Sequence, residues 1–233
     1  MRPSAATNRG RDTPIPQLDK RLTGRFFARP ALEVAPALIG RTLFSIAPEG
    51  LVAGRIVEVE AYGGFGGVAA PLSTESRAPE AANPLKSNSG SSDPGSHAFR
   101  GRTPRNSVMF GPPGHLYVYF TYGMHHCANI VTDADGVAGA VLLRAVEPTE
   151  GLDLMAQRRG TDDLRKLARG PARLCQAFAL DLGHNRADLA TGDVWVGRTR
   201  RLSLPIQTSA RVGLRPGMDQ PWRFYEPGIW VSP

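Results

Sequence analysis

The sequence predicts one domain of the α+β class, and three observations support this prediction. Segments typical of β-strands dominate the chain from residue 41 to about residue 146, and helical segments follow them. The chain of 233 residues shows no internal repeat and no charged linker that would divide it. Its hydrophobic fraction of 41% is enough for a large core, which excludes a small fold that depends on disulfides.

The strand signals are alternating or continuous apolar runs bounded by turn residues, such as Ala-Pro-Glu-Gly at 47–50 and Asp-Ala-Asp-Gly at 133–136. The run VLLRAV is apolar almost throughout, so we expect it at the centre of the sheet. The last three strands should form an antiparallel meander. In chain order, the strands are expected over Arg41–Ile46, Leu51–Ala61, His115–Thr121, Cys127–Val131 and Gly139–Val146.

Helices are predicted on both sides of this strand-rich part. Gly40 is a plausible end for the first one, and Pro171 suits the first turn of the last one, where the missing N–H of proline does no harm. Short strands should return near 194–196, 206 and 222–225. The helices are expected over Ala31–Leu38, from Thr149 to Arg159, from Asp162 or Asp163 toward Ala168, and onward from Pro171.

Two segments are predicted to lack regular structure. Residues 1–19 are rich in Arg, Pro, Thr and Asn, which predicts a disordered basic arm ahead of a domain spanning 20–233. A Gly-, Pro- and Ser-rich run predicts a long flexible loop at about 65–92. So long a loop inside a domain is unusual and calls for a functional or insertional explanation.

The composition points to a polyanionic partner. The formal net charge is +7, and 25 of the 28 basic residues are arginine, whose flat guanidinium suits phosphate. The sequence contains no run of 18 apolar residues, so no membrane-spanning helix is expected. The N-terminus lacks the apolar core of a signal peptide, so a cytoplasmic protein is expected. Cys127 and Cys175 lie far apart and are expected to be buried free thiols.

Glu58 and Glu60 are two residues apart in a predicted strand, so both carboxylates should point to one face. They could bind a metal, one could act as a general base, or both could lie on a solvated face beside Arg55. Arg144 is a single charge inside the apolar run VLLRAV. A buried charge needs a partner, and Glu60 is an available one.

Aromatic and basic side chains gather in the same part of the chain. Tyr117 and Tyr119 share a strand face, which fits either packing or a platform for stacking a base. Tyr122 lies at a hairpin tip, where packing explains a tyrosine poorly. Arg102 and Arg105 lie in a short loop whose composition suits either phosphate contact or a solvated surface.

The sequence that contains these residues resembles the alkyladenine (3-methyladenine) DNA glycosylases. The resemblance rests on RIVEVEAYGG, DPGSHAFRGRTPRNSVMFGPPGHLYVYFTYGMHHCANIV, VLLRAVEP, LARGPARLCQAFALD, RVGL at 211–214 and PWRFYEPGIWVS. It runs from about Leu22 to the C-terminus, except for about 25 residues at roughly 68–92 that separate EAY from the following histidine. It implies a curved antiparallel sheet, a protruding hairpin that enters the DNA minor groove, and flanking helices.

The resemblance also implies roles for individual residues. Glu60 matches the general base, Arg144 the arginine that helps to hold the attacking water, and His97 a histidine that contacts both the site and the flipped base. The remaining matches are Tyr62 and Tyr119 for stacking the base, Asn129 for the pocket, Tyr122 for intercalation, and Arg102, Arg105 and Met124 for the DNA backbone.

The implied activity is removal of a damaged purine from double-stranded DNA by a monofunctional enzyme, a monomer that needs neither metal nor cofactor. The lysines Lys20, Lys86 and Lys166 lie away from the proposed site, so water is the expected nucleophile and no lyase activity is expected. The damage could be 3-methyladenine, 7-methylguanine, hypoxanthine or ethenoadenine.

Two other functions remain open from the sequence. One is a metal-dependent nuclease built on Glu58, Glu60, Asp93 and His97. The other is a module that binds lesions or nucleic acids generally, uses its tyrosines only for stacking, and releases no base.

Overall fold

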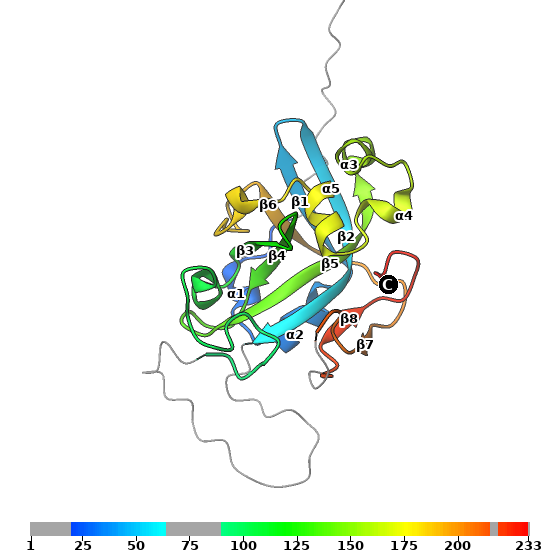
Figure 1. Ribbon diagram of the computed structural model, residues 1–233. Helices are drawn as coiled ribbons and strands as arrows, with labels where there is room; N and C mark the ends of the chain where they lie inside the picture. The colour runs from blue at the N-terminus through cyan, green and yellow to red at the C-terminus, as the bar shows by residue number, and fades with distance from the viewer. Residues whose placement is uncertain (1–19, 64–89, 215–218, 233) are drawn as a thin grey trace, which may run out of the picture.

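The computed structural model describes residues 20–63, 90–214 and 219–232, and it has the predicted α+β architecture (Figure 1). The strands are β1 (Arg41–Ala47), β2 (Gly50–Gly63), β3 (Leu116–Thr121), β4 (His125–Val131), β5 (Gly139–Glu150), β6 (Val194–Arg200), β7 (Gln207–Ser209) and β8 (Arg223–Tyr225). The helices are α1 (Gly24–Phe27), α2 (Ala31–Leu38), α3 (Leu152–Arg159), α4 (Leu164–Leu167) and α5 (Pro171–Ala177), with 3₁₀ turns η1 (Ser107–Phe110) and η2 (Leu182–His184).

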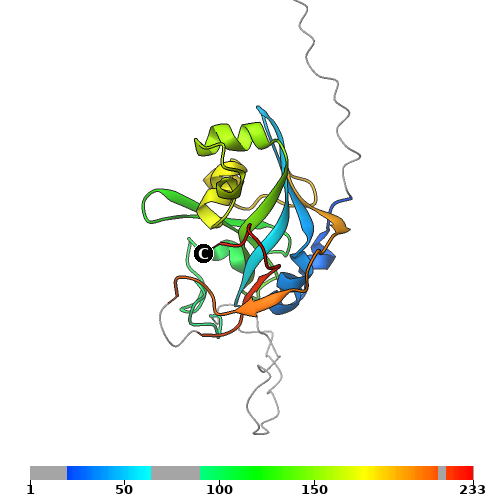
Figure 2. The ribbon, with the colours of Figure 1, turned by 90° about the vertical axis from the view of Figure 1, so that its right-hand side faces the viewer.

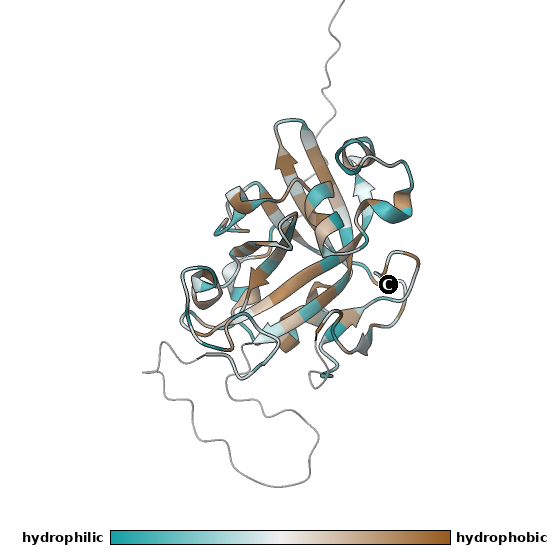
Figure 3. Cartoon of the chain, in the orientation of Figure 1, coloured by the Kyte–Doolittle hydropathy of each residue, from teal (hydrophilic) through white to brown (hydrophobic). Residues whose placement is uncertain are grey.

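The described strands form one antiparallel sheet in the order β3-β4-β5-β2-β1-β6, and β8 adds to β2 and to β7. The predicted meander of β3, β4 and β5 is confirmed. The central strand β2 has 14 residues and pairs with β1, β5 and β8, so its carboxylates lie in the middle of the molecule. Figure 3 shows β5 as hydrophobic over most of its length, as expected for a strand covered on both faces.

Helices cover both faces of the sheet (Figure 2). Helices α1 and α2 lie on one side of the sheet, and α3 and α5 lie on the other, together with the protruding β3–β4 hairpin. In α2, the apolar residues Ala31, Val34, Ala35 and Leu38 follow helical spacing and are fully buried. The helix begins where Asp133 Oδ2 accepts the Ala31 N–H at 3.2 Å, so the β4–β5 turn caps it.

The stretch of β2 that carries the glutamates has an irregular register with β5. Ile56 lies opposite Val146 and Glu58 opposite Ala145, so Val57 is an extra residue in β2. Glu58 and Val59 then lie opposite Ala145 and Leu143, so Arg144 is an extra residue in β5. A β-bulge frees backbone groups from the ladder and redirects a side chain. Here the freed Arg144 carbonyl accepts the Gly170 N–H at 3.0 Å, just before α5 begins.

The prediction that Thr149 caps a helix is wrong. Strand β5 continues to Glu150, which lies opposite Ala53, and α3 begins at Leu152 after Gly151. Pairing with the long strand β2 therefore overrides the local capping signal. The predicted cap of α4 by Asp163 is confirmed, since its side chain accepts the Arg165 N–H at 3.1 Å.

The predicted arm at 1–19 and most of the predicted loop at 65–92 lie outside the described residues. Within the described part of the chain, no helix is long and apolar enough to cross a membrane.

Candidate active site

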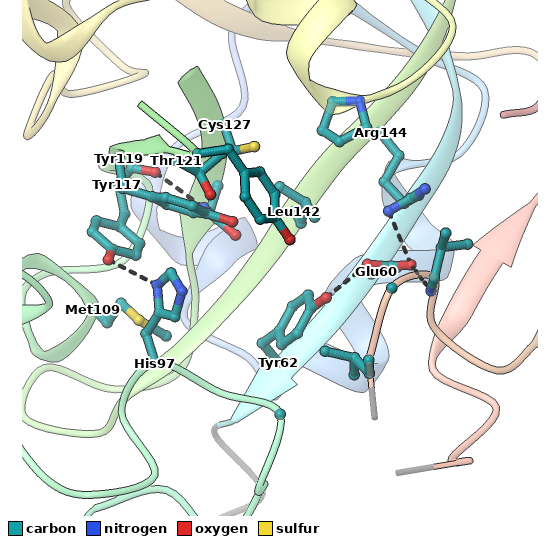
Figure 4. Close-up of a pocket in the computed structure, with 17 residues that line it drawn as sticks. Glu60, Tyr62, His97, Met109, Tyr117, Tyr119, Thr121, Cys127, Leu142 and Arg144 are labelled. Carbon is teal, nitrogen blue, oxygen red and sulfur yellow. Dashed lines mark hydrogen bonds and ion pairs between the residues drawn. The ribbon is translucent and has the colours of Figure 1, made fainter. Parts of the chain in front are cut away.

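A pocket of about 270 Å³ opens between the C-terminal part of β2 and strands β3, β4 and β5 (Figure 4). Its volume is near the lower end of ligand pockets, which start at about 300 Å³, so it fits a small molecule such as a single base. Aromatic and charged side chains line it together. The lining residues are Glu60, Tyr62, Gly95, His97, Met109, Tyr117, Tyr119, Thr121, Tyr122, Cys127, Asn129, Leu142, Arg144, Pro171, Val212, Gly213 and Leu214.

Glu60 is fully buried at the base of this pocket and is held by three donors. Its Oε2 accepts the Tyr62 hydroxyl at 2.7 Å, and its Oε1 accepts the Val212 N–H at 2.7 Å. The Arg144 Nη1 lies 3.2 Å from the same Oε1. A carboxylate offers about four lone-pair positions, so one acceptor position is left for a further donor. A water molecule in the pocket would suit that position.

Arg144 lies between the two glutamates. Its Nε donates to Glu58 Oε1 at 2.7 Å while its Nη1 faces Glu60, so one guanidinium bridges both carboxylates. Glu60 is the partner expected for Arg144 from the sequence, whereas the contact between Arg144 and Glu58 was not predicted. The two glutamates share one side of β2, as predicted, but they are not solvated, and Arg55 pairs with Glu147 and Glu226 instead.

Glu58 lies behind the pocket and does not line it. Its carboxylate also accepts Arg223 Nε at 2.8 Å, and the N–H and hydroxyl of Ser232 at 2.6 and 2.7 Å. Burial opposes the ionisation of Glu58, but the Arg144 charge and the Ser232 hydrogen bonds outweigh it and lower its pKa. Glu58 is therefore an ionised anchor that orients Arg144.

His97 forms the opposite wall with two tyrosines. Its Nδ1 hydrogen-bonds the Tyr117 hydroxyl at 3.0 Å, and its ring meets the Tyr119 ring edge-on at a centroid distance of 4.6 Å. Burial, helped by the nearby Arg105 charge, lowers the pKa of His97. The imidazole is therefore neutral at pH 7 and can both donate and accept a hydrogen bond.

Tyr62 lies beside Glu60, and Arg211 covers one face of its ring at 4.5 Å. Burial, together with the Glu60 charge, raises the pKa of Tyr62, so its hydroxyl stays protonated and keeps donating to Glu60. Arg211 is held in turn by Asp93 through two hydrogen bonds of 2.6 and 2.7 Å, and by the Ala61 carbonyl at 2.9 Å. This pair joins the end of β2 to the segment that carries His97.

Asn129 and Cys127 close the inner end of the pocket from β4. The Asn129 Nδ2 donates to the Tyr117 carbonyl at 3.1 Å, which fixes its amide orientation. Cys127 lies opposite Tyr119 in the ladder, and burial raises the pKa of its thiol, so it stays protonated. Both cysteines are free and buried, as predicted.

The hairpin beside the pocket presents an exposed aromatic tip. Tyr122 is 88% exposed and Met124 69% exposed, although both are large and apolar. Tyr122 also has a φ of +51°, which is uncommon for a residue other than glycine. A strained, exposed tyrosine at a loop tip is typical of a contact residue. Arg102 and Arg105 are exposed, and Arg105 Nη2 reaches the carbonyl of Phe120 in the same hairpin at 3.4 Å.

Comparison with known protein families gives one match that covers most of the chain. Residues 25–83 and 87–229 match the family described as methylpurine-DNA glycosylase. The chain belongs to this family. All residues that line the pocket lie within the matched ranges.

Several bacterial proteins are similar to this chain over most of its length. A protein of Rhodopseudomonas palustris (strain HaA2) is 43% identical, over 87% of this chain and 85% of its own length. Proteins of Streptomyces avermitilis and Carboxydothermus hydrogenoformans are 44% and 41% identical, over 88% of this chain and 86% and 94% of their own lengths. All three are provisionally named 3-methyladenine DNA glycosylases.

The structure of the glycosylase gathers most of the predicted site residues in one place. Seven line the pocket: Glu60, Tyr62, His97, Tyr119, Tyr122, Asn129 and Arg144. Arg102, Arg105 and Met124 lie on the exposed surface and not in the lining. Arg211 and Val212 were not predicted as site residues, although both lie in the RVGL motif, which is a signal that could have identified them.

The arrangement of the carboxylates in the glycosylase does not support the alternative of a metal-dependent nuclease. Asp93 is taken up by Arg211, and Glu58 is taken up by Arg144 and Arg223. Carboxylates neutralised by arginines in this way are poorly suited to binding a metal ion.

Proposed function

We propose that the glycosylase flips an alkylated or deaminated purine out of duplex DNA and hydrolyses its N-glycosidic bond, leaving an abasic site. The observation that carries this proposal is Glu60, a buried carboxylate that faces an aromatic pocket and keeps one acceptor position. A water molecule bound there would be polarised toward whatever occupies the pocket.

In the proposed reaction, the oxygen of this water attacks the sugar C1′ while the bond from C1′ to the purine nitrogen breaks. The bonding electrons leave with the purine, and Glu60 takes the proton from the water. The carboxylate also stabilises positive charge that develops on the sugar. Arg144 lies 3.2 Å from Glu60 and fixes the position of its carboxylate before the reaction.

The base would stack between Tyr62 on one side and Tyr119 with His97 on the other. Figure 4 shows these side chains on opposite walls of the pocket. Electron-poor or cationic purines stack well on tyrosine, so this pocket favours alkylated bases without a separate contact for each lesion. This supports 3-methyladenine, 7-methylguanine, hypoxanthine and ethenoadenine as the substrate class. The buried Asn129 amide would contact the base edge.

The exposed Tyr122 would fill the space that the flipped base leaves in the stack, which offsets the few kcal/mol that flipping requires. Arg102 and Arg105, with Met124, would contact the DNA backbone. The acting unit that we propose is a monomer. In the described part of the chain the lysines are Lys20 and Lys166, and neither lines the pocket, which supports water as the nucleophile and no lyase step.

The test is release of free base from methylated duplex DNA in single-turnover conditions. Glu60→Gln should lower the rate by about 10²- to 10⁴-fold, as removal of a general base does, while binding to the same DNA persists. Glu49→Gln is the matched control, because Glu49 is 61% exposed and far from the pocket. The wild type should release base without strand breaks and regardless of a chelator.

Two outcomes would contradict the proposal. Release by Glu60→Gln at the wild-type rate would remove Glu60 from the chemistry. Tight binding of the lesion by the wild type without any base release would instead favour the non-catalytic binding module.

A further inference from the structure

A buried ion pair lies beside the pocket without lining it. The Arg211 guanidinium donates to both carboxylate oxygens of Asp93, at 2.6 and 2.7 Å, and both side chains are fully buried. Neither residue is among the described residues that line the pocket. A two-pronged bond of this kind has a fixed geometry, because the planar guanidinium matches the two oxygens of a carboxylate. The pair is therefore a rigid joint outside the space that a base would fill.

Arg211 contacts the wall of the pocket that carries Glu60. Its Nη1 also donates to the Ala61 carbonyl at 2.9 Å, and its guanidinium lies 4.5 Å over the Tyr62 ring. The next residue in the chain, Val212, donates its N–H to Glu60 Oε1 at 2.7 Å. Two of the donors to the Glu60 carboxylate, this N–H and the Tyr62 hydroxyl, therefore depend on the position of Arg211.

Asp93 contacts the wall that carries His97. Its Oδ1 accepts the Gly95 N–H at 2.9 Å, and its carbonyl accepts the Ser96 N–H at 3.0 Å. These two bonds close the turn that leads directly into His97. The Oδ2 of Asp93 accepts the Gly63 N–H at 3.0 Å, so the same carboxylate ties this turn to the end of β2. A change at Asp93 would therefore move His97 relative to β2.

The absence of a side chain at Gly95 allows the two halves of the pair to meet. A Cβ atom there would lie 2.6 Å from Arg211 Nη2 and 2.9 Å from Leu214 Cδ1, so one of these groups would have to move. Glycine permits this close approach of the backbone. Gly95→Ala should therefore displace the guanidinium while both charges of the pair remain.

We propose that Asp93 and Arg211 are positioning residues, which set the separation between the Glu60 wall and the His97 wall of the pocket. Neither touches the base or the reacting atoms. The reaction needs the water on Glu60 and the stacked base to meet in one geometry, and a misplacement of about 1 Å can lower a rate roughly 100-fold even when the altered residue is remote from the chemistry. This inference rests on the proposed function, because it assigns the pair a role in base release.

The experiment compares Arg211→Lys with Arg55→Lys. Lysine keeps the charge, but it cannot form the two-pronged bond to Asp93 or lie flat over a ring. Arg55 is the matched control, because its side chain is only 15% exposed, pairs with Glu147 and Glu226, and does not line the pocket. Base release is measured in single-turnover conditions with saturating protein. The fluorescence of an ethenoadenine lesion reports stacking in the pocket, and binding to undamaged duplex and the melting temperature are measured for each variant.

We expect Arg211→Lys to release base about 10- to 100-fold more slowly than the wild type, while its affinity for undamaged duplex is unchanged. The fluorescence change on stacking should be smaller than in the wild type. Arg55→Lys should lose thermal stability but keep the wild-type rate. Asp93→Asn should be slow as well, and the double variant Asp93→Asn with Arg211→Lys should be no slower than the slower single variant, because the two residues act as one unit. Gly95→Ala, which keeps both charges, should slow release in the same way and tests the role should Arg211→Lys fail to fold.

Three results would overturn the proposal: a wild-type rate in Arg211→Lys, equal slowing in Arg55→Lys, or effects of Arg211→Lys and Asp93→Asn that multiply in the double variant. Glu60→Gln is measured alongside to separate this proposal from the proposed function. A wild-type rate in Glu60→Gln would refute the proposed function, and the ethenoadenine fluorescence would then decide whether the pair positions the walls. A slow Glu60→Gln beside a fast Arg211→Lys would refute only the positioning role.

Discussion

Replacing Glu58 with glutamine should lower the free energy of unfolding, although Glu58 does not line the pocket. The Glu58 carboxylate is fully buried and accepts hydrogen bonds from Arg144, Arg223 and Ser232. In Glu58→Gln, an amide NH₂ group replaces one oxygen, so a donor faces groups that are themselves donors. The guanidinium of Arg144 then loses its second carboxylate inside the core.

The size of the effect follows from the burial of this pair. Breaking a buried ion pair by removing one partner costs about 3–5 kcal/mol, because the remaining charge stays in the core. For a domain of this length, 1 kcal/mol corresponds to roughly 2–4 °C, so the melting temperature should fall by about 10 °C. The Glu58 pKa is lowered in the fold, so its contribution is present at neutral pH and is lost as pH falls through that value.

The assay is urea unfolding of the wild type, Glu58→Gln and Glu60→Gln between pH 3 and pH 8, together with base release. Glu58→Gln should lose stability at neutral pH and approach the wild type in acid. Ser232→Ala, which removes one donor to Glu58, should show a smaller loss in the same direction. An unchanged unfolding midpoint in Glu58→Gln at pH 7 would refute the idea that Glu58 anchors Arg144 and the C-terminal segment.

Two further predictions concern the turn that caps α2 and the hairpin tip. Burial raises the pKa of Asp133 to about 7, so the stability that Asp133 contributes is full below about pH 4 and is lost as pH rises through 7. In urea unfolding, Asp133→Asn should therefore reduce the dependence of the unfolding free energy on pH. An unchanged pH dependence would contradict this assignment. Tyr122→Ala should keep the melting temperature but slow release from a paired lesion, through loss of about 1–3 kcal/mol of stacking. Release from single-stranded DNA should change little, and equal slowing on both substrates would rule out the intercalating role.

The local elements could be predicted because their signals are local. The spacing of Ala31, Val34, Ala35 and Leu38 defines a helical face without reference to the rest of the chain. The turns at 47–50 and 133–136 likewise mark strand ends through their own residues. The α+β class and the meander therefore followed from the sequence, and the glycosylase motifs pointed to the pocket residues.

The tertiary structure alone decided which polar side chains far apart in the sequence come into contact. The pairs Asp93–Arg211 and Glu58–Ser232 are 118 and 174 residues apart, and no periodicity in the chain predicts them. The same holds for the bulges at Val57 and Arg144, because a bulge depends on the register with the neighbouring strand and not on either strand by itself. The sequence determined which side chains of β2 and β5 carry groups that could take part in a reaction. Strand register determined that Arg144 bridges Glu58 and Glu60, since a side chain's direction is set by the backbone that pairs beside it.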